Sequence, residues 1–236
     1  MSDAPLILAL PSKGRLMERA SEMFEGAGLP VRKTGHERGY RGEIAGRKDV
    51  EIAFLSASEI AQQLNLGRVH AGITGEDLIR ESGREGAERI ELVRPLGFGG
   101  ADVVVAVPEC WLDVSKMGDI EEVAAIFFRV HGRRLRVATK YMNLTRRFFS
   151  EKGVTGYRIV ESLGATEGTI AAGTAEIIVD ITSTGTTLKA NHLKVLDDGI
   201  ILKSQAILAK SKTADWSRGS EQALEEIVSR LQAGSG

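Results

Sequence analysis

The stretch EGTIAAGTAEIIVDITSTGTTLKAN, residues 167–191, combines three local patterns in one continuous run. The segment AEIIVDI (175–181) is an apolar, β-branched run typical of a buried strand. It passes into STGTT, a loop of small hydroxyl-bearing residues with one glycine, and then at once into a helical pattern. A strand, a hydroxyl-rich turn and a helix start form an arrangement that holds phosphate, because backbone N–H groups and the positive helix end face the anion. The stretch therefore predicts an anionic ligand.

The loop itself, called the phosphate loop below, comprises Ser183, Thr184, Gly185, Thr186 and Thr187. Gly185 lets a ligand approach the backbone closely. Asp180 ends the preceding strand and Glu167 lies upstream, and carboxylates in these places repel a bare phosphate. They suit a sugar phosphate, whose hydroxyls can donate to them while its phosphate lies in the loop. The alternative is an ordinary helix N-cap, in which Ser183 or Thr184 satisfies its own backbone.

Composition limits the class of protein. The 236 residues are 42% hydrophobic, enough for a sizeable core, and 31 basic against 32 acidic residues give a net charge of −1. This balance argues against nucleic acid or a membrane surface as partner. The single cysteine, Cys110, excludes an internal disulfide and a cysteine-based zinc site. With no signal-like segment and no 18-residue apolar run, we expect a cytoplasmic protein.

The periodicity of apolar residues predicts alternating strands and helices throughout the chain. Residues 6–11 read as a strand and 16–27 as an amphipathic helix, and the alternation continues to about residue 95 as an α/β lobe with a largely parallel sheet. The pattern restarts at the strand 101–108, after the glycine-rich joint LGFGG (96–100). Two strands around a tight DDG turn (197–199) and a helix over 216–231 complete the chain. We expect lobe I to comprise residues 1–98 plus 187–236, and lobe II to comprise residues 99–186.

The opening stretch resembles the signature of the ATP phosphoribosyltransferase family, which catalyses the first step of histidine biosynthesis. The matching positions are Glu167, Gly173, Ala175, Ile178, Asp180, Ile181, Thr184, Gly185, Thr187 and Leu188. The resemblance extends to LPSKGRL (10–16), to residues 52–79 and to VATKYMNLTRRFF (137–149), so it covers nearly the whole chain.

The resemblance implies two α/β lobes similar to type II periplasmic binding proteins, with a substrate cleft between them. It implies transfer of the phosphoribosyl group of phosphoribosyl pyrophosphate to N1 of the adenine of ATP, with Mg²⁺ held mainly by substrate phosphates. The phosphate loop, Glu167 and Asp180 would then bind phosphoribosyl pyrophosphate. Such a reaction needs no activated side-chain nucleophile, because the ring nitrogen is already nucleophilic.

Further site residues follow from the same resemblance. Lys13 and Arg15 follow the first strand, where open α/β sheets bind ligands, and are expected to contact ATP and to stabilise the leaving pyrophosphate. Arg38, in HERGYRG (36–42), is implied as a third catalytic cation. Glu76, Asp77 and Tyr141 are implied on the ATP side. For each cation the alternative is an ordinary solvated surface charge.

The length resembles the short form of the family. That form is similar to a catalytic subunit, a homodimer that works in a larger hetero-oligomer with a separate regulatory protein related to histidyl-tRNA synthetase. Three positions depart from the family pattern: Ser12 is inserted, Ala165 replaces a common serine, and Met142 replaces a frequent proline. A solute-binding protein of the same fold and a nucleobase-salvage phosphoribosyltransferase remain as alternatives.

Overall fold

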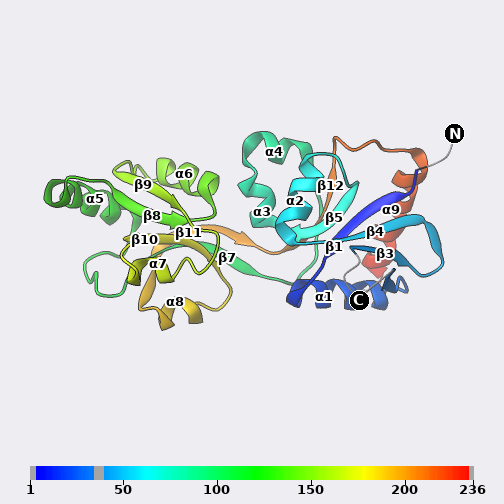
Figure 1. Cartoon of the computed structure of the whole chain (residues 1–236), viewed down its shortest axis with the longest axis horizontal. Helices are drawn as coiled ribbons and strands as arrows, with labels where there is room; N and C mark the ends of the chain where they lie inside the picture. Colours follow the sequence, from blue (N-terminus) through cyan, green and yellow to red (C-terminus); the bar gives the residue numbers. More distant parts are fainter. Residues whose placement is uncertain (1–3, 35–39, 234–236) are drawn as a thin grey trace. The chain divides into compact units, whose positions relative to one another are not determined.

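The chain folds into two α/β units, which the computed structural model describes over residues 4–34 and 40–233 (Figure 1). Unit 1 comprises Met1–Gly99 and Gln205–Gly236, and unit 2 comprises Gly100–Ser204. The chain leaves unit 1 within the glycine-rich joint 96–100 and returns to it after Ser204. Among the helices of the described ranges, none combines the length and apolar character that a membrane crossing requires.

The second boundary between the units differs from the expected one. Residues 187–204 belong to unit 2 rather than to lobe I, because strand β11 (Leu193–Ser204) pairs antiparallel with β7 (Ala101–Pro108) across most of its length. The sequence marks the helix start at Thr186 clearly. It carries no local signal for which of the two sheets the next strand joins.

Unit 1 is built on a seven-stranded sheet in the order β2-β3-β4-β1-β5-β12-β6. Its strands are β1 (Leu6–Pro11), β2 (Val31–Lys33), β3 (Arg41–Ile44), β4 (Arg47–Leu55), β5 (Ala71–Gly75), β6 (Ile90–Pro95) and β12 (Ala206–Ser211). Strand β1 runs parallel to β4 and β5, whereas β3 pairs antiparallel with β4 and β12 pairs antiparallel with β5 and β6. The sheet is therefore mixed: most of its strands run in one direction, as predicted, whereas β3 and the returning strand β12 run in the other.

Helices cover both faces of this sheet. They are α1 (Gly14–Gly26), α2 (Ala57–Asn65), α3 (Glu76–Glu81), α4 (Gly83–Arg89) and α9 (Arg218–Ala233). Along β1, Leu6, Leu8 and Leu10 pack with α1 and α9, while Ala9 packs with α2 and α3 on the other face. On α9, Leu224 and Ile227 lie in this core, so the apolar face of the predicted C-terminal helix is core, with about 1.5–3 kcal/mol for each fully buried side chain.

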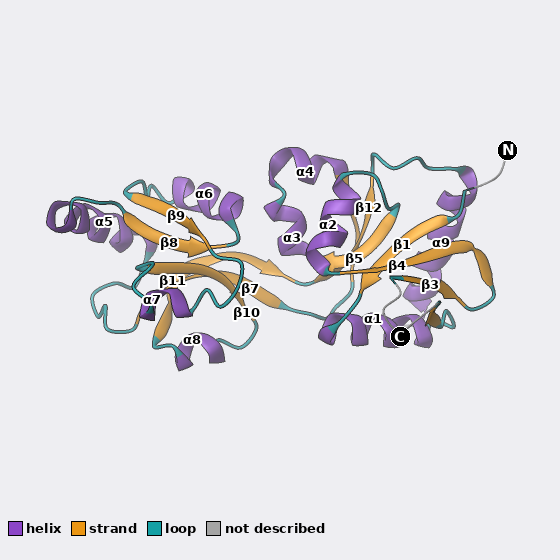
Figure 2. Ribbon diagram, in the orientation of Figure 1, coloured by secondary structure: helices purple, strands orange, loops and turns teal. Residues whose placement is uncertain are grey.

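Unit 2 has a five-stranded sheet in the order β11-β7-β10-β8-β9 (Figure 2). Its remaining elements are β8 (Leu135–Thr139), β9 (Tyr157–Glu161), β10 (Ile177–Thr182), α5 (Met117–His131), α6 (Met142–Glu151), α7 (Gly168–Ala171) and α8 (Thr186–Ala190). Strands β9, β8 and β10 are mutually parallel, and β7 is antiparallel to β10. Ile170 of α7 and Leu188 of α8 join one face of the core, where Val104 and Ala106 point.

The DDG segment does not form the predicted hairpin turn. It lies inside β11, in a bulge where the register with β7 shifts between Val195 and Ile200. Asp198 accepts a hydrogen bond from the Met117 N–H at 2.8 Å and pairs with the Lys152 ammonium at 2.8 Å. The local sequence does not reveal these two contacts, which hold Asp198 within the strand. The strand instead ends at Ser204, one residue before Gln205.

A charged cluster ties the amino ends of β8 and β10 together. The Arg136 guanidinium donates to the Glu176 carboxylate at 2.6 Å, the Arg136 N–H donates to it at 2.8 Å, and Arg133 donates at 3.1 Å. Burial alone would raise the pKa of Glu176, but these bonds lower it from 4.5 to about 2. This cluster lies at the opposite end of β10 from Asp180, so we assign it a structural role.

Replacing Glu176 with Gln is expected to lower the free energy of unfolding by about 1–2 kcal/mol at neutral pH, after allowance for solvent screening. Because the folded-state pKa is lowered, the stabilisation is present above pH 4.5 and is lost as the pH falls toward about 2. Urea unfolding of both proteins at pH 7 and pH 3 measures this: the gap between them should shrink at pH 3. An equal gap at both pH values would mean that the carboxylate charge is not responsible.

Candidate functional site

The predicted sugar-phosphate residues gather at one edge of the sheet in unit 2. Strands β9, β8 and β10 are parallel and in register, with Glu161 opposite Thr139 and Thr139 opposite Val179, so their carboxyl ends meet. The segments that follow these ends carry Lys140, Glu167 and the phosphate loop. Open α/β sheets bind ligands at this edge.

The phosphate loop leaves β10 and turns into the short helix α8. Gly185, the N-cap of α8, has a φ of +73°, a left-handed conformation that glycine adopts without strain. The Gly185 N–H donates to the Thr182 hydroxyl at 2.9 Å, and the Thr184 and Thr186 hydroxyls lie 2.8 Å apart. The remaining bond within the loop, from the Thr186 N–H to the Thr184 hydroxyl, is long at 3.4 Å. The N-cap alternative is thus only weakly realised, and the exposed threonine hydroxyls are available to a ligand.

Asp180 lies half-buried on β10 beside this loop. Its carboxylate accepts the Ile181 N–H at 2.8 Å. Burial raises the pKa of Asp180, the neighbouring charge of Glu167 raises it further, and Lys140 and the Thr166 hydroxyl act in the opposite direction. Two carboxylates, an ammonium and a hydroxyl therefore share one small region, and a perturbed acid at a sheet edge is typical of a functional site.

The segment between β9 and α7 brings Glu167 to this region. The Ser162 N–H donates to the Thr139 carbonyl at 3.1 Å, and the buried Thr166 hydroxyl donates to the Ser162 hydroxyl at 3.1 Å. Ala165 has a φ of +48°, a left-handed conformation that costs energy in any residue with a Cβ atom. This strain lies in the segment that positions Glu167, where a functional constraint can maintain it.

Tyr141 is placed differently from a ligand-contacting residue. It is 1% exposed, its N–H donates to the Thr139 hydroxyl at 2.8 Å, and its ring belongs to the core of unit 2. Its burial indicates a packing role. The neighbouring Lys140 is exposed, with Nζ 4.9 Å from the centroid of that ring. Sequence reasoning passed over Lys140, although its place directly after a strand was a usable signal.

In unit 1, the parallel strands β1, β4 and β5 also end at a common edge. Lys13 and Arg15 lie there, both exposed, on either side of Gly14, whose φ of +74° opens helix α1. The inserted Ser12 continues the strand, because its N–H donates to the Leu55 carbonyl at 2.8 Å. Bonds from Ser56 lower the pKa of Glu59, and the charge of Lys13 adds to this effect, which places Lys13 near the start of α2.

The predicted acids of unit 1 are engaged in local structure. The Glu76 carboxylate accepts a hydrogen bond from Arg80 at 3.0 Å and its side chain is 16% exposed. Asp77 is buried at the start of α3, with its carboxylate folded back against Gly75. Arg38 lies outside the described residues. Lys13 and Arg15 are therefore the predicted residues of unit 1 that the structure leaves open to solvent.

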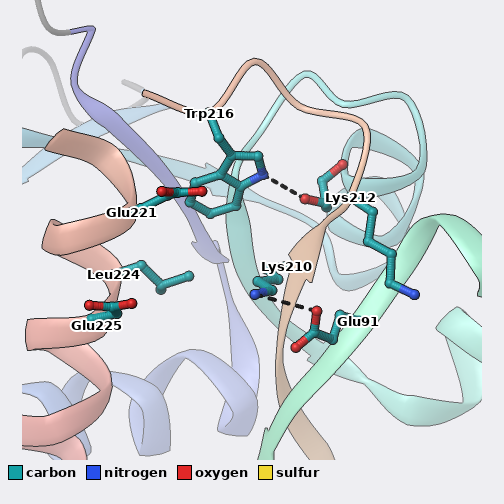
Figure 3. Close-up of a pocket in the computed structure, with 8 residues that line it drawn as sticks. Glu91, Lys210, Lys212, Trp216, Glu221, Leu224 and Glu225 are labelled. Carbon is teal, nitrogen blue, oxygen red and sulfur yellow. Dashed lines mark hydrogen bonds and ion pairs between the residues drawn. The ribbon is translucent and has the colours of Figure 1, made fainter. Parts of the chain in front are cut away.

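A pocket of about 350 Å³ lies in unit 1, and none of the predicted site residues that the structure describes lines it (Figure 3). It is lined by Glu91, Lys210, Ser211, Lys212, Trp216, Glu221, Leu224 and Glu225. The Lys210 ammonium pairs with Glu91 at 3.3 Å, and the Trp216 N–H donates to the Ser211 carbonyl at 2.7 Å. With three glutamates and two lysines, one of them paired, this pocket is electrostatically unsuited to a polyphosphate.

Metal-ligating side chains do not cluster in the described part of the chain: within residues 4–34 and 40–233, no three His, Cys, Asp or Glu side chains could hold an ion together. Asp180 and Glu167 are two carboxylates beside the phosphate loop. Their oxygens are of the kind that Mg²⁺ takes when substrate phosphates supply the remaining ligands.

Comparison with known proteins identifies the family. Residues 56–233 match the family model for ATP phosphoribosyltransferase. The chain is 58% identical over 229 residues to the ATP phosphoribosyltransferase of Bradyrhizobium sp. (strain ORS 278), covering 97% of this chain and 70% of that relative. It is also 58% identical over 232 residues to the enzyme of Mesorhizobium japonicum, covering 98% of this chain and 100% of that relative.

Solved structures show the same fold at low sequence identity. The ATP phosphoribosyl transferase (HisG:HisZ) complex from Thermotoga maritima has a chain that superposes with a TM-score of 0.73 at 23% identity, covering 97% of this chain and 98% of that one. The arginine-bound form of ArgBP from T. maritima superposes with a TM-score of 0.53 at 13% identity, covering 98% and 97%. The two α/β units thus resemble those of type II periplasmic binding proteins, as predicted. Because the family model matches most of its length and curated relatives are 58% identical over nearly the whole chain, this chain belongs to the ATP phosphoribosyltransferase family.

Proposed function

We propose that this chain transfers the 5-phosphoribosyl group of phosphoribosyl pyrophosphate to N1 of the adenine of ATP and releases pyrophosphate, the first step of histidine biosynthesis. The observation that carries the proposal is the phosphate loop at the carboxyl edge of three parallel strands, with Asp180 and Glu167 beside it. Hydrogen-bond donors for a phosphate, next to carboxylates that accept from hydroxyls, suit a ligand with both phosphate and hydroxyl groups, as a phosphorylated ribose has.

Each group has a part in the reaction. The phosphate loop binds the 5′-phosphate, and Asp180 and Glu167 accept hydrogen bonds from ribose hydroxyls. The lone pair of adenine N1 forms a bond to the anomeric carbon while the bond from that carbon to the pyrophosphate oxygen breaks, and pyrophosphate leaves with the electron pair. Catalysis depends on alignment and on charge stabilisation of pyrophosphate by Lys13 and Arg15. Bound Mg²⁺ would offset part of the same negative charge, held mainly by phosphate oxygens.

The partners follow from the same proposal. A solved relative is a HisG:HisZ complex, and we infer that this chain likewise works with a separate regulatory subunit, as a homodimer within a larger hetero-oligomer. Size-exclusion chromatography with light scattering, on the chain alone and after addition of such a subunit, measures both assembly steps.

The reaction is tested by incubating the purified chain with ATP, phosphoribosyl pyrophosphate and Mg²⁺ in the presence of a pyrophosphatase. Mass spectrometry should detect the phosphoribosyl adduct of ATP. Turnover with a free purine or pyrimidine base, and none with ATP, would assign the chain to nucleobase salvage instead. The assay is repeated with the regulatory subunit present, and an adduct formed only then would make that subunit part of the active enzyme.

Arg15 offers a specific prediction. Replacing it with Ala should lower kcat about 10- to 100-fold and change the KM for ATP much less, because a charge-assisted contact to leaving pyrophosphate is strongest in the transition state. Arg19→Ala is the matched control, since Arg19 lies on the same helix, is exposed and pairs with Glu22 at 3.2 Å. Steady-state kinetics with each substrate varied separately measures both effects. A change confined to the KM for ATP would indicate that Arg15 contacts the triphosphate of ATP instead of the leaving pyrophosphate.

A further inference from the structure

The negative charges in the candidate site of unit 2 are unfavourable for the anionic ligand proposed to bind there. Its ligand would carry a 5′-phosphate and a pyrophosphate, yet the groups beside the phosphate loop include two carboxylates, Asp180 and Glu167. The loop itself supplies hydroxyls and N–H groups, which are neutral. Besides Mg²⁺ and the cations of unit 1, a cation of unit 2 close to these groups would favour binding of a polyanion at this edge of the sheet.

Lys140 places a cation at that edge. Thr139 pairs with Val179 in the parallel register of β8 and β10, so Lys140 and Asp180 are the next residues along the two neighbouring strands. Its charge acts on Asp180, where it favours the ionised carboxylate and lowers the pKa. Its side chain is exposed and can therefore reach a ligand in solvent.

The position of the Lys140 ammonium is supported by a fixed aromatic ring. Nζ lies 4.9 Å from the centroid of the Tyr141 ring, within cation–π range. That ring is held in place by packing, because Tyr141 is 1% exposed. The Tyr141 backbone carbonyl also accepts the Thr145 hydroxyl at 2.6 Å. A long lysine side chain ordinarily loses entropy on binding, and a rigid platform reduces that loss.

A second lysine of unit 2, Lys152, makes a similar contact with an aromatic ring that has only a structural role. Lys152 also lies over an aromatic ring, with Nζ 5.5 Å from the centroid of Phe148, but its ammonium is neutralised by Asp198 at 2.8 Å. Lys140 forms no ion pair of this kind in the part of the chain that the structure describes. Its exposed ammonium, which lies over the Tyr141 ring, can therefore also contact a ligand.

We propose that Lys140 is a substrate-binding residue: its ammonium contacts a phosphate oxygen of phosphoribosyl pyrophosphate, and the buried ring of Tyr141 serves as its platform. The contact also offsets the repulsion between that ligand and the Asp180 and Glu167 carboxylates. This inference rests on the proposed function, and it gives the buried Tyr141 an indirect part at the site.

The test is isothermal titration calorimetry of phosphoribosyl pyrophosphate with Mg²⁺ against the wild-type chain and three variants. Lys140→Met keeps the length of the side chain and removes its charge, and its dissociation constant should rise about 10- to 100-fold. Lys140→Arg should restore binding to within about fivefold, and Lys152→Met, the matched control, should bind as the wild type does. The thermal midpoint of Lys140→Met should match the wild type, because the side chain is exposed.

Salt dependence supplies a readout that a structural role would not move. The affinity of Lys140→Met should fall less steeply with ionic strength than that of the wild type, because one ionic contact is missing. Wild-type affinity in Lys140→Met would overturn the inference, as would an equal loss in Lys152→Met. If the wild-type chain itself did not bind phosphoribosyl pyrophosphate, the proposed function would fail first, and this inference with it.

Discussion

Replacing Asp180 with Asn is expected to lower kcat/KM for phosphoribosyl pyrophosphate about 10- to 150-fold while raising the thermal stability of the protein. The kinetic loss follows from exchanging a charged acceptor of the ribose hydroxyls for a neutral one. The gain in stability follows from burial, which raises the pKa of Asp180. A carboxyl group with a raised pKa stabilises the fold below its unfolded-state pKa, and this contribution is lost as the pH rises through the folded-state pKa.

At neutral pH the ionised Asp180 therefore destabilises the fold, and an uncharged side chain of the same shape relieves this. The Asn amide oxygen can still accept the Ile181 N–H, which Asp180 binds at 2.8 Å. We expect the thermal midpoint to rise by about 1–3 °C at pH 7 and the difference to vanish under acidic conditions. Differential scanning calorimetry at several pH values, alongside steady-state kinetics, measures both.

Glu176→Gln is the matched control for this experiment. It is the same chemical change next to the other end of the same strand, but there the pKa of the carboxyl group is lowered by two arginines. Its stability should fall and its kinetics should stay unchanged, the reverse of the Asp180 variant on both counts. Unchanged kinetics in Asp180→Asn would remove Asp180 from the site. A fall in its stability at pH 7 would contradict the assignment of a destabilising charge.

Much of the fold was predictable because local periodicity sets local structure. The strand at 101–108 appears with the predicted bounds. The spacing of Ser56 and Glu59 is that of a capping box, and both of its bonds form, at 3.3 and 2.8 Å. Pairing was less predictable. The direction of β12 and the membership of β11 depend on contacts with strands about 100 residues earlier, such as Ser204 with Ala101, and no local pattern encodes them.

The features of the candidate site also divide into those that the local sequence predicts and those that depend on tertiary structure. The strand end, the loop and the helix start around Asp180 were predictable because they follow one another in a single stretch of sequence. The burial of Tyr141 and the place of Lys140 beside Asp180 depend on how β8 and β10 align. Resemblance to a family does not show whether a residue is exposed or buried. Only the packing of unit 2 shows that Tyr141 is buried and that its neighbour Lys140 is exposed.

Replacing Gly185 with Val is expected to abolish measurable binding of phosphoribosyl pyrophosphate, a loss of at least about 100-fold in affinity, with a modest loss of stability. Two effects combine. The φ of +73° is unfavourable for a β-branched residue and costs about 1–2 kcal/mol. A Cβ atom on Gly185 meets no protein atom within 4 Å, so within the protein the added side chain extends into open space beside the loop. We expect a bound phosphate to occupy that space.

Gly153→Val separates the two effects, because Gly153 has the same φ of +73° and equally open surroundings. It follows the far end of helix α6, whose first residue, Met142, comes two positions after Lys140. Both variants should lose similar stability, on the order of a few degrees in thermal midpoint, but only Gly185→Val should lose the ligand in a calorimetric titration. Equal affinities in the two variants would show that the backbone of the phosphate loop does not contact the sugar phosphate. Loss of binding in both would trace the effect to backbone strain in unit 2 rather than to blocked access.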